Sequence, residues 1–377
     1  MKQTKEPNLK IDKKSLIMAV FSTRIFHNEG SLVRATYDSV ELIEKVRDDD
    51  LIERIISFYQ NTHKLDLGSS MWQLISSYQA PIHKALMEND ENIVIKTYQN
   101  PGKNELFSGY DFLRKSCQVE FEYDHIGLAY AKLCLDGLIR FAEYIGAIPL
   151  DNPESWGAKT TSPYDAETII DNLDSFAWKF TLPNPYPNEF GLSTSRGVLS
   201  YRVPQALYQA WRIKKLVQGI ENPRILEIGA GLGRTAYYAN ELGIKDYTII
   251  DIPMTATAQG YFLGRTIGEN NILFENEKVD ENNPKIRIIS PQTFIDENNQ
   301  YDLIVNVDSL TEMDKLVAQE YWEKIKTSTN TFLSINHESN SFTVRDLLLK
   351  DLTLLNISRE QYWMRRGYVE ELIKINT

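Results

Sequence analysis

The sequence is poor in cysteine and has no long apolar run. Its 377 residues include two cysteines, Cys117 and Cys134, which cannot form a disulfide framework or a cysteine-rich zinc site. No stretch of about 18 apolar residues occurs, so no membrane-spanning helix is expected. The apolar stretch 16–21 that follows the basic N-terminus is too short for the core of a signal peptide. We therefore expect a reduced, cytoplasmic setting.

Positive charge is also in deficit. The chain has 41 basic and 52 acidic residues, a net charge of −11, and such a surface repels phosphate backbones, so no nucleic-acid partner is expected. Hydrophobic residues make up 42% of the chain and aromatic residues 11%, which excludes a disordered chain. The length indicates two or three domains at roughly 150 residues per domain.

The first part of the chain, residues 1–148, is predicted to form a mostly helical domain. Apolar residues recur at helical spacing over 38–59, 71–88 and 124–145. Pro81 is expected to end or kink the second of these helices, because proline lacks the backbone N–H group.

Residues 149–219 have a different composition. They contain seven of the 14 prolines together with many aromatic residues, whereas a flexible linker is rich in glycine and serine. We expect an ordered, irregular connecting segment that contacts a substrate; the alternative is that it only wraps one domain onto the other. Pro204 is predicted to open a helix over 204–218.

From residue 220 onwards, short apolar runs alternate with helical segments. This alternation predicts a parallel sheet with right-handed crossovers. The last two runs, 352–363 and 368–375, are joined by too few residues for a crossover and must pair antiparallel. The five preceding runs are 224–228, 247–250, 286–289, 303–307 and 331–335.

The first turn of this unit contains the clearest motif, which runs from Glu227 to Gly233. Glycines at positions 229, 231 and 233 let the backbone turn sharply and approach a ligand closely. The motif follows an apolar run and opens a helix. Asp251 ends the next predicted strand, where a carboxylate can accept both ribose hydroxyls of an adenosine.

Two ligands compete for such a turn. A dinucleotide-binding turn has the spacing G-x-G-x-x-G, but here the glycines are spaced G-x-G-x-G and Glu227 lies two residues before the first. A diphosphate would be repelled by this carboxylate, whereas an ammonium group would be attracted. The charges therefore favour S-adenosylmethionine over NAD. A glycine turn with no ligand is the third reading.

Residues 224–377 resemble the class I S-adenosylmethionine-dependent methyltransferases, through the E-x-G-x-G-x-G motif, Asp251 and the closing hairpin. More narrowly, the chain is similar to a bacterial family of sugar O-methyltransferases. The matching stretches are STSRGVLSYRVPQALYQAWRI (193–213), ILEIGAGLGRTAYYA (225–239), YTIIDIP (247–253), YDLIVNVDSLTEMD (301–314) and YWMRRGYVEEL (362–372).

The resemblance implies a Rossmann-like class I methyltransferase sheet over 220–377, preceded by the helical domain, with S-adenosyl-L-methionine as cofactor. It implies transfer of a methyl group to a hydroxyl of a sugar, a sugar-containing metabolite or a glycan. A non-sugar natural product, or a non-catalytic cofactor-binding partner protein, is the alternative. The expected cofactor contacts are Glu227, Gly229, Ala230, Gly231, Gly233, Asp251, Ile252, Ser290 and Asn306.

The stretch IIDIP is also similar to plant-type O-methyltransferases, whose helical N-terminal domain mediates dimerisation. A homodimer formed through residues 1–148 is therefore one arrangement that the resemblance implies. Neither the acceptor nor the position methylated follows from the sequence.

Methylation of a hydroxyl needs a base or a metal ion, because a hydroxyl is a poor nucleophile at neutral pH. Asp308, Glu312 and His337 follow the fourth and fifth predicted strands, at the edge where open α/β sheets bind ligands. Which of them acts is left open. Asp308 could instead cap a helix, Glu312 could be an ordinary first-turn acid, and His337 could merely form hydrogen bonds in a loop.

Residues upstream of the glycine turn are the candidate acceptor contacts. They are Arg196, Tyr201, Arg202 and Tyr208. The alternative is that they only pack the joining helix. Arg365 and Arg366 in the final hairpin are expected to be exposed turn residues. Asp308, Glu312 and Glu338 could supply oxygen ligands to magnesium, but no compact ligand motif occurs and a metal-free site is expected.

Overall fold

The computed structural model shows an α/β fold built around one large sheet. The described residues are 35–36, 49–64, 71–113, 115, 124–150, 165–187, 189–280 and 283–376. The strands of this sheet are β4 (Arg224–Ile228), β5 (Asp246–Ile250), β6 (Ile272–Phe274), β7 (Ile286–Ile289), β8 (Leu303–Val307), β9 (Thr331–His337), β10 (Leu355–Gln361) and β11 (Tyr368–Ile375). Within the described residues their order across the sheet is β10-β11-β9-β8-β4-β5-β7-β6.

The strand directions confirm the predicted fold class. β4 pairs parallel with both β5 and β8, β8 pairs parallel with β9, and β5 and β6 both pair parallel with β7. β11 runs antiparallel to β9 and β10. The central strands are almost wholly apolar because helices cover both faces of a parallel sheet. These helices include α10 (Arg234–Glu241), α11 (Pro253–Leu263), α12 (Pro291–Asp296), α13 (Lys315–Ser328) and α14 (Val344–Leu348).

Two details of the sheet differ from the prediction. β6 was not anticipated, since its three residues at the sheet edge are too few to show a period of two. The run predicted from residue 352 begins as a strand only at Leu355, because Leu352–Leu354 form a turn of 3-10 helix.

The described part of the N-terminal region is mostly helical, as predicted, apart from strand β1 (Ala35–Thr36) and a loop over 104–113. Its helices are α2 (Asp49–Thr62), α3 (Met71–Tyr78), α4 (Ala80–Met87), α5 (Glu91–Gln99) and α7 (Asp124–Ile145). Pro81 lies in the first turn of α4 and separates it from α3, which confirms the predicted break. The first part of the helix predicted over 38–59, residues 38–48, lies outside the described residues.

The connecting segment contains more regular structure than we expected. The expectation of an irregular stretch was wrong at α8 (Ala166–Phe176) and at the hairpin of β2 (Gly191–Thr194) and β3 (Gly197–Leu199), which β1 (Ala35–Thr36) extends. Residues 151–164 lie outside the described residues. Helix α9 (Arg202–Leu216) begins two residues before Pro204. Proline is tolerated there because the first N–H groups of a helix have no intrahelical partner.

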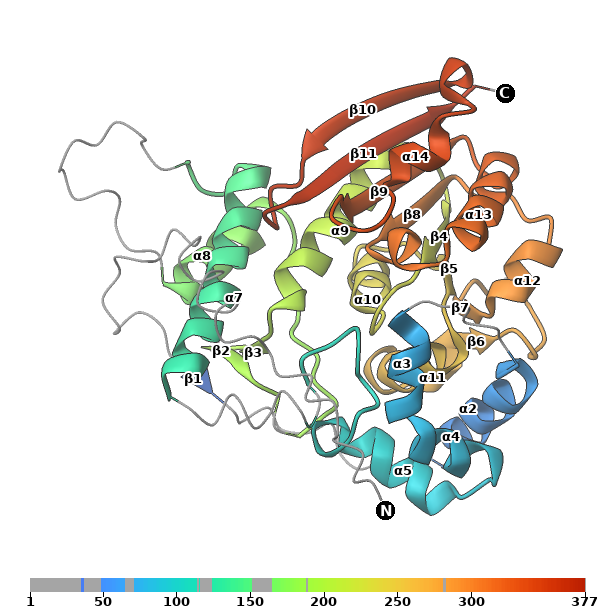
Figure 1. Cartoon of the computed structure of the whole chain (residues 1–377). Helices are drawn as coiled ribbons and strands as arrows, with labels where there is room; N and C mark the ends of the chain where they lie inside the picture. The colour runs from blue at the N-terminus through green and yellow to red at the C-terminus, as the bar shows by residue number, and fades with distance from the viewer. Residues whose placement is uncertain are drawn as a thin grey trace.

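One hydrophobic cluster extends from the N-terminal helices to the sheet. It contains residues from α2 through β11, and Figure 1 shows α2 to α5, in blue to cyan, lying beside α11 and β6. Every residue of α11 is buried, since one side packs on the sheet and another on α2. Arg54 of α2 also pairs with Glu277, just after β6. The predicted boundaries at residues 148 and 219 stay predictions.

No helix in the described ranges combines the length and the apolar character needed to cross a membrane.

Candidate functional site

The turn between β4 and α10 holds three glycines in left-handed conformations. Gly229, Gly231 and Gly233 have φ angles of 74°, 56° and 87°, a region that residues with a Cβ disfavour. A Cβ on Gly229 would collide with the side chain of Ser309, whereas one on Gly231 would meet no described atom within 4 Å. Gly229 therefore serves packing between two strand ends, and Gly231 leaves the turn open towards the cavity that it lines.

A buried network fixes the start of this turn. Asn306 of β8 donates from Nδ2 to the carbonyl of Ile228 at 3.0 Å, and Ser309 Oγ donates to the same carbonyl at 2.9 Å. Asn336 Nδ2 in turn donates to Asn306 Oδ1 at 2.9 Å. Asn306 was expected to contact the cofactor, but it is not among the described residues that line the cavity. It instead stabilises the turn through its hydrogen bond to Ile228.

Two carboxyl groups flank the turn, one buried and the other partly buried. Glu227 of β4 is 2% exposed and accepts a hydrogen bond from the Tyr247 hydroxyl at 2.8 Å. Asp251, just after β5, accepts from the Ile252 N–H at 2.9 Å and from Gln259 Nε2 at 2.6 Å. Burial raises the pKa of each carboxyl to about 7. A cationic or hydrogen-bond-donating ligand would stabilise their ionised forms.

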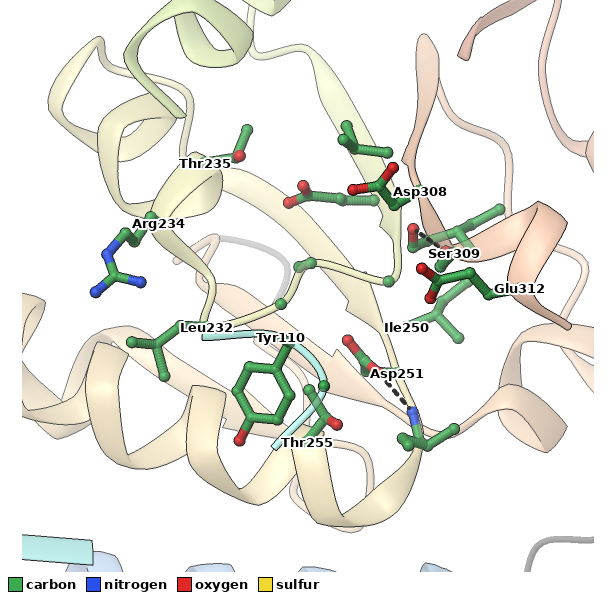
Figure 2. A pocket seen from close by; sticks show the side chains of 18 of the residues that line it. Tyr110, Leu232, Arg234, Thr235, Ile250, Asp251, Thr255, Asp308, Ser309 and Glu312 are labelled. Carbon is green, nitrogen blue, oxygen red and sulfur yellow. Dashed lines mark hydrogen bonds between the residues drawn. The ribbon is translucent and has the colours of Figure 1, made fainter. Parts of the chain in front are cut away.

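One cavity brings much of the predicted site together (Figure 2). It lies at the carboxyl ends of β4, β5 and β8, as expected for an open α/β sheet, and residues of the helical region close part of it. The predicted site residues that line it are Arg202, Glu227, Gly229, Ala230, Gly231, Asp251, Ile252, Asp308 and Glu312.

Asp308 has a backbone conformation that residues other than glycine seldom adopt. Its φ of 68° is strained, and such strain concentrates at functional sites. The side chain forms no capping hydrogen bond to the helical turn that follows, so the expected alternative of an N-cap does not apply. Asp308 Oδ2 instead accepts from Arg365 Nη1 at 3.0 Å and lies 4.0 Å from Arg202 Nη1.

The position of Arg365 corrects an expectation. We expected an exposed turn residue, but its side chain is 27% exposed and its guanidinium lies 4.0 Å from the centre of the Tyr368 ring. The neighbouring Arg366 is exposed as expected. The difference arises because the final hairpin folds back on the end of β8, a contact between distant parts of the chain.

Glu312 is the second acid at this end of the cavity. It is half-buried, and burial together with the nearby charge of Asp308 raises its pKa to about 7, although Arg202 and Arg365 act in the opposite direction. No group of three or more potential metal ligands among His, Cys, Asp and Glu occurs in the part of the chain that the structure describes.

Several predicted residues lie away from the cavity lining. These are Arg196, Tyr201, Tyr208, Gly233, Ser290, Asn306 and His337. His337 ends β9, where its Nδ1 is 2.8 Å from Ser339 Oγ and its ring meets Tyr368 edge-on. Ser290 caps α12 by accepting a hydrogen bond from the Thr293 N–H. His337 therefore lies outside the cavity lining that contains Asp308 and Glu312, although Tyr368, which its ring meets, also contacts Arg365, the partner of Asp308.

The candidate acceptor contacts divide in the same way. Arg196 forms an ion pair with Asp174 of α8, and the Tyr208 hydroxyl donates to Glu370 of β11 at 2.5 Å. Both residues join neighbouring elements, as the packing alternative supposed. Arg202 alone of the four lines the cavity.

Four further residues of the cavity were not expected from the sequence. Trp72 and Tyr110 come from the helical region, and nothing local to them in the sequence indicates a ligand. Arg234 directly follows the glycine motif, which was an available signal. Thr255 lies in the first turn of α11, and its buried hydroxyl has no hydrogen-bond partner among the described residues.

Comparison with known proteins finds only partial likenesses. No protein-family model matches the chain, and no curated protein matches it. The glycopeptide N-methyltransferase MtfA complexed with sinefungin shares 11% identity over 45% of this chain and 94% of that chain, with a TM-score of 0.34. Magnesium protoporphyrin IX methyltransferase from Synechocystis PCC 6803 shares 13% identity over 46% of this chain and 78% of that chain, with a TM-score of 0.31. Mitomycin 7-O-methyltransferase MmcR shares 13% identity over 46% of this chain and 55% of that chain, with a TM-score of 0.33.

Proposed function

We propose that the chain is an S-adenosylmethionine-dependent O-methyltransferase. The observation that carries the proposal is a glycine turn, open at Gly231, between two carboxyl groups on one cavity, the buried Glu227 and the partly buried Asp251. S-Adenosylmethionine presents an ammonium group, a sulfonium charge and two ribose hydroxyls. The carboxyl groups suit the ammonium and the ribose respectively.

The polar groups of the cavity fit this cofactor better than a dinucleotide. The acids Glu227, Asp251, Asp308 and Glu312 line it together with two arginines, Arg202 beside Asp308 and Arg234, whose charge is engaged by Asp111 and Glu189. A diphosphate would meet repulsion from this arrangement. The unpartnered Thr255 hydroxyl gives a further group that a ribose could satisfy. When bound, S-adenosylmethionine supplies an electrophilic methyl group.

The chain's own contribution to catalysis would be to orient the acceptor and remove its proton. Glu312 is the base that we propose, because a pKa near 7 lets it hold a proton at one step and release it at neutral pH. Asp308 is held by Arg365 and would fix the acceptor rather than take the proton. His337 lies off the cavity and is the less suitable candidate.

An unsatisfied donor and an unsatisfied acceptor support a hydroxyl as the group methylated. Arg202 Nε and Asp308 Oδ1 are both buried and lack hydrogen-bond partners among the described residues. A hydroxyl group satisfies both at once, since it accepts from one and donates to the other. Trp72 supplies an aromatic wall on which the apolar face of a sugar can stack, so we propose a sugar-containing acceptor.

Binding and turnover test the proposal separately. Calorimetry with S-adenosylmethionine should show binding to the wild-type chain, and Asp251→Ala should raise the Kd by at least about tenfold, or 1.4 kcal/mol. Absence of binding to the wild-type chain, or binding of NAD instead, would overturn the cofactor assignment.

The acceptor is then sought with methyl-labelled S-adenosylmethionine and a panel of free sugars, nucleotide sugars, glycans and phenolic natural products. Transfer to a sugar hydroxyl supports the proposal, and transfer only to phenols assigns the alternative acceptor class. Tight cofactor binding without transfer to any acceptor would indicate a non-catalytic partner protein.

A further inference from the structure

A loop of the helical region closes one side of the cavity. Tyr110 is 8% exposed and lines the cavity with Asp251 and Thr255, and Figure 2 shows its ring between Leu232 and Thr255. The Tyr110 hydroxyl donates to the Leu106 carbonyl at 3.0 Å. The hydroxyl is therefore engaged within its own loop, and the ring is the part that a ligand would meet.

This loop, residues 104–113, is held in place from the side of the helical region. Gln79 Nε2 donates to the Leu106 carbonyl at 2.9 Å. Gly109 has a φ of 95°, and a Cβ there would approach Ile75 and Trp72 of α3 at 2.8 and 3.0 Å. The approach of α3 fixes the backbone next to Tyr110, and only glycine allows it.

The loop is also tied to the glycine turn by a buried charge cluster. Arg234 is the first residue of α10, directly after Gly233, and is 8% exposed. Its guanidinium pairs with Asp111, next to Tyr110, and with Glu189 at 3.2 Å. Asp111 also accepts from the Leu113 N–H at 3.0 Å. Removing one member of such a cluster leaves a buried charge uncompensated.

We infer that loop 104–113 forms one wall of the cofactor site and that the Tyr110 ring contacts the nucleoside end of S-adenosylmethionine. Arg234 positions this loop through its ion pair with Asp111. The inference rests on the proposed cofactor. It also assigns a cofactor contact to the helical region, which the sequence separated from the cofactor-binding part. Tyr110 is a binding residue on this view, whereas Arg234 and Asp111 are positioning residues.

Calorimetry with S-adenosylmethionine on single variants of the full chain tests the contact. Tyr110→Ala is expected to raise the Kd about tenfold, while Tyr110→Phe keeps the ring and stays within about twofold of wild type. Glu297→Gln breaks an arginine–carboxylate pair away from the cavity and serves as a matched control with unchanged affinity. Wild-type affinity in Tyr110→Ala would overturn the contact.

A double-mutant cycle tests the positioning role. Asp111→Asn is expected to raise the Kd about fivefold in the wild-type background but to add less than about twofold to Tyr110→Ala, because its effect passes through the Tyr110 ring. A merely structural role would weaken binding equally in both backgrounds. Equal effects would therefore overturn the role of Asp111 and Arg234.

Hydrogen exchange on the wild-type chain covers the case in which a variant fails to fold. The amides of loop 104–113 are expected to gain protection when S-adenosylmethionine is added, and unchanged exchange there would overturn the inference. If the wild-type chain binds no S-adenosylmethionine, the proposed function itself fails. If it binds and loop 104–113 shows no change, only this inference fails.

Discussion

Three acids at one cavity share the same electrostatic condition. Burial raises the pKa of Glu227, Asp251 and Glu312 to about 7, so at neutral pH each is ready to change its protonation state. Cationic or hydrogen-bond-donating ligands shift such groups towards the ionised form. The desolvation cost of ionising these acids is thus offset by the kind of ligand that we propose.

Glu227→Gln should stabilise the empty protein while weakening cofactor binding. Between about pH 4.5 and 7 the folded state holds a proton that the unfolded state has lost, so the contribution of Glu227 to the free energy of unfolding falls as pH rises through this window. Glutamine does not titrate and still accepts from Tyr247. We expect urea titrations to show a gain of about 1–3 kcal/mol at pH 8 and a much smaller gain at pH 5. Equal effects at both pH values would contradict this.

Glu312→Gln should remove the acidic limb of the rate profile. If Glu312 is the base, kcat/KM rises with pH through the pKa near 7, and the variant loses about a hundredfold in rate or more with unchanged cofactor affinity. His337→Gln is the comparison, since His337 lies off the cavity. A large loss in His337→Gln and none in Glu312→Gln would reverse the assignment.

The site residues that sequence reasoning placed on the cavity belong to contiguous motifs. Glu227, Gly231 and Asp251 sit at strand ends whose position follows from apolar runs nearby. The roles of Arg196 and Arg365 depend on partners 22 and 57 residues away, Asp174 and Asp308. Neither ion-pair partner can be predicted from the local sequence pattern, because that pattern does not distinguish an arginine in a salt bridge from an arginine on an exposed turn.

At the scale of elements, the glycine turn separates packing from ligand access. Gly229→Ala should lower the free energy of unfolding by about 2 kcal/mol or more, since the Cβ meets Ser309 and the φ is positive. Gly231→Ala meets no described atom and should lower it by only about 1 kcal/mol while reducing cofactor affinity. Denaturant titration measures the change in the free energy of unfolding, and calorimetry measures the change in cofactor affinity. The prediction is contradicted if Gly231→Ala destabilises the fold more than Gly229→Ala.

The elements that could be predicted are those with a complete period. The five predicted parallel runs each have four or five mostly apolar residues between turn signals, and the final hairpin follows from the short connection between its two runs. β6 has three residues at an edge, and α8 lies in a stretch whose prolines and aromatics suggested irregular structure. For β6 the pairing with β7 decided the outcome, which a three-residue pattern does not record. For α8 the signal was in the sequence, since Ile169, Ile170 and Leu173 recur at helical spacing after the N-cap Asp165.

At the scale of the whole molecule, α5 is joined to the cofactor-binding part by a buried hydrogen bond. Tyr98 donates to Thr257 of α11 at 2.5 Å, within a hydrophobic cluster that spans both regions. We expect one calorimetric transition for the chain, and Tyr98→Phe should lower the free energy of unfolding by about 1 kcal/mol.

Tyr78→Phe is the matched control for this change. The buried Tyr78 hydroxyl has no partner among the described residues, so its removal should be neutral or slightly stabilising. Two separate transitions in the wild-type scan, or equal destabilisation by both variants, would contradict the coupling.

Trp72 gives this fold an intrinsic optical probe. Trp72 comes from the helical region and lines the cavity at the carboxyl ends of the sheet strands. The chain has six tryptophans in all. The emission that disappears in Trp72→Phe isolates its signal from the other five. Candidate acceptors can then be screened by fluorescence titration of unlabelled protein, before any assay of turnover exists.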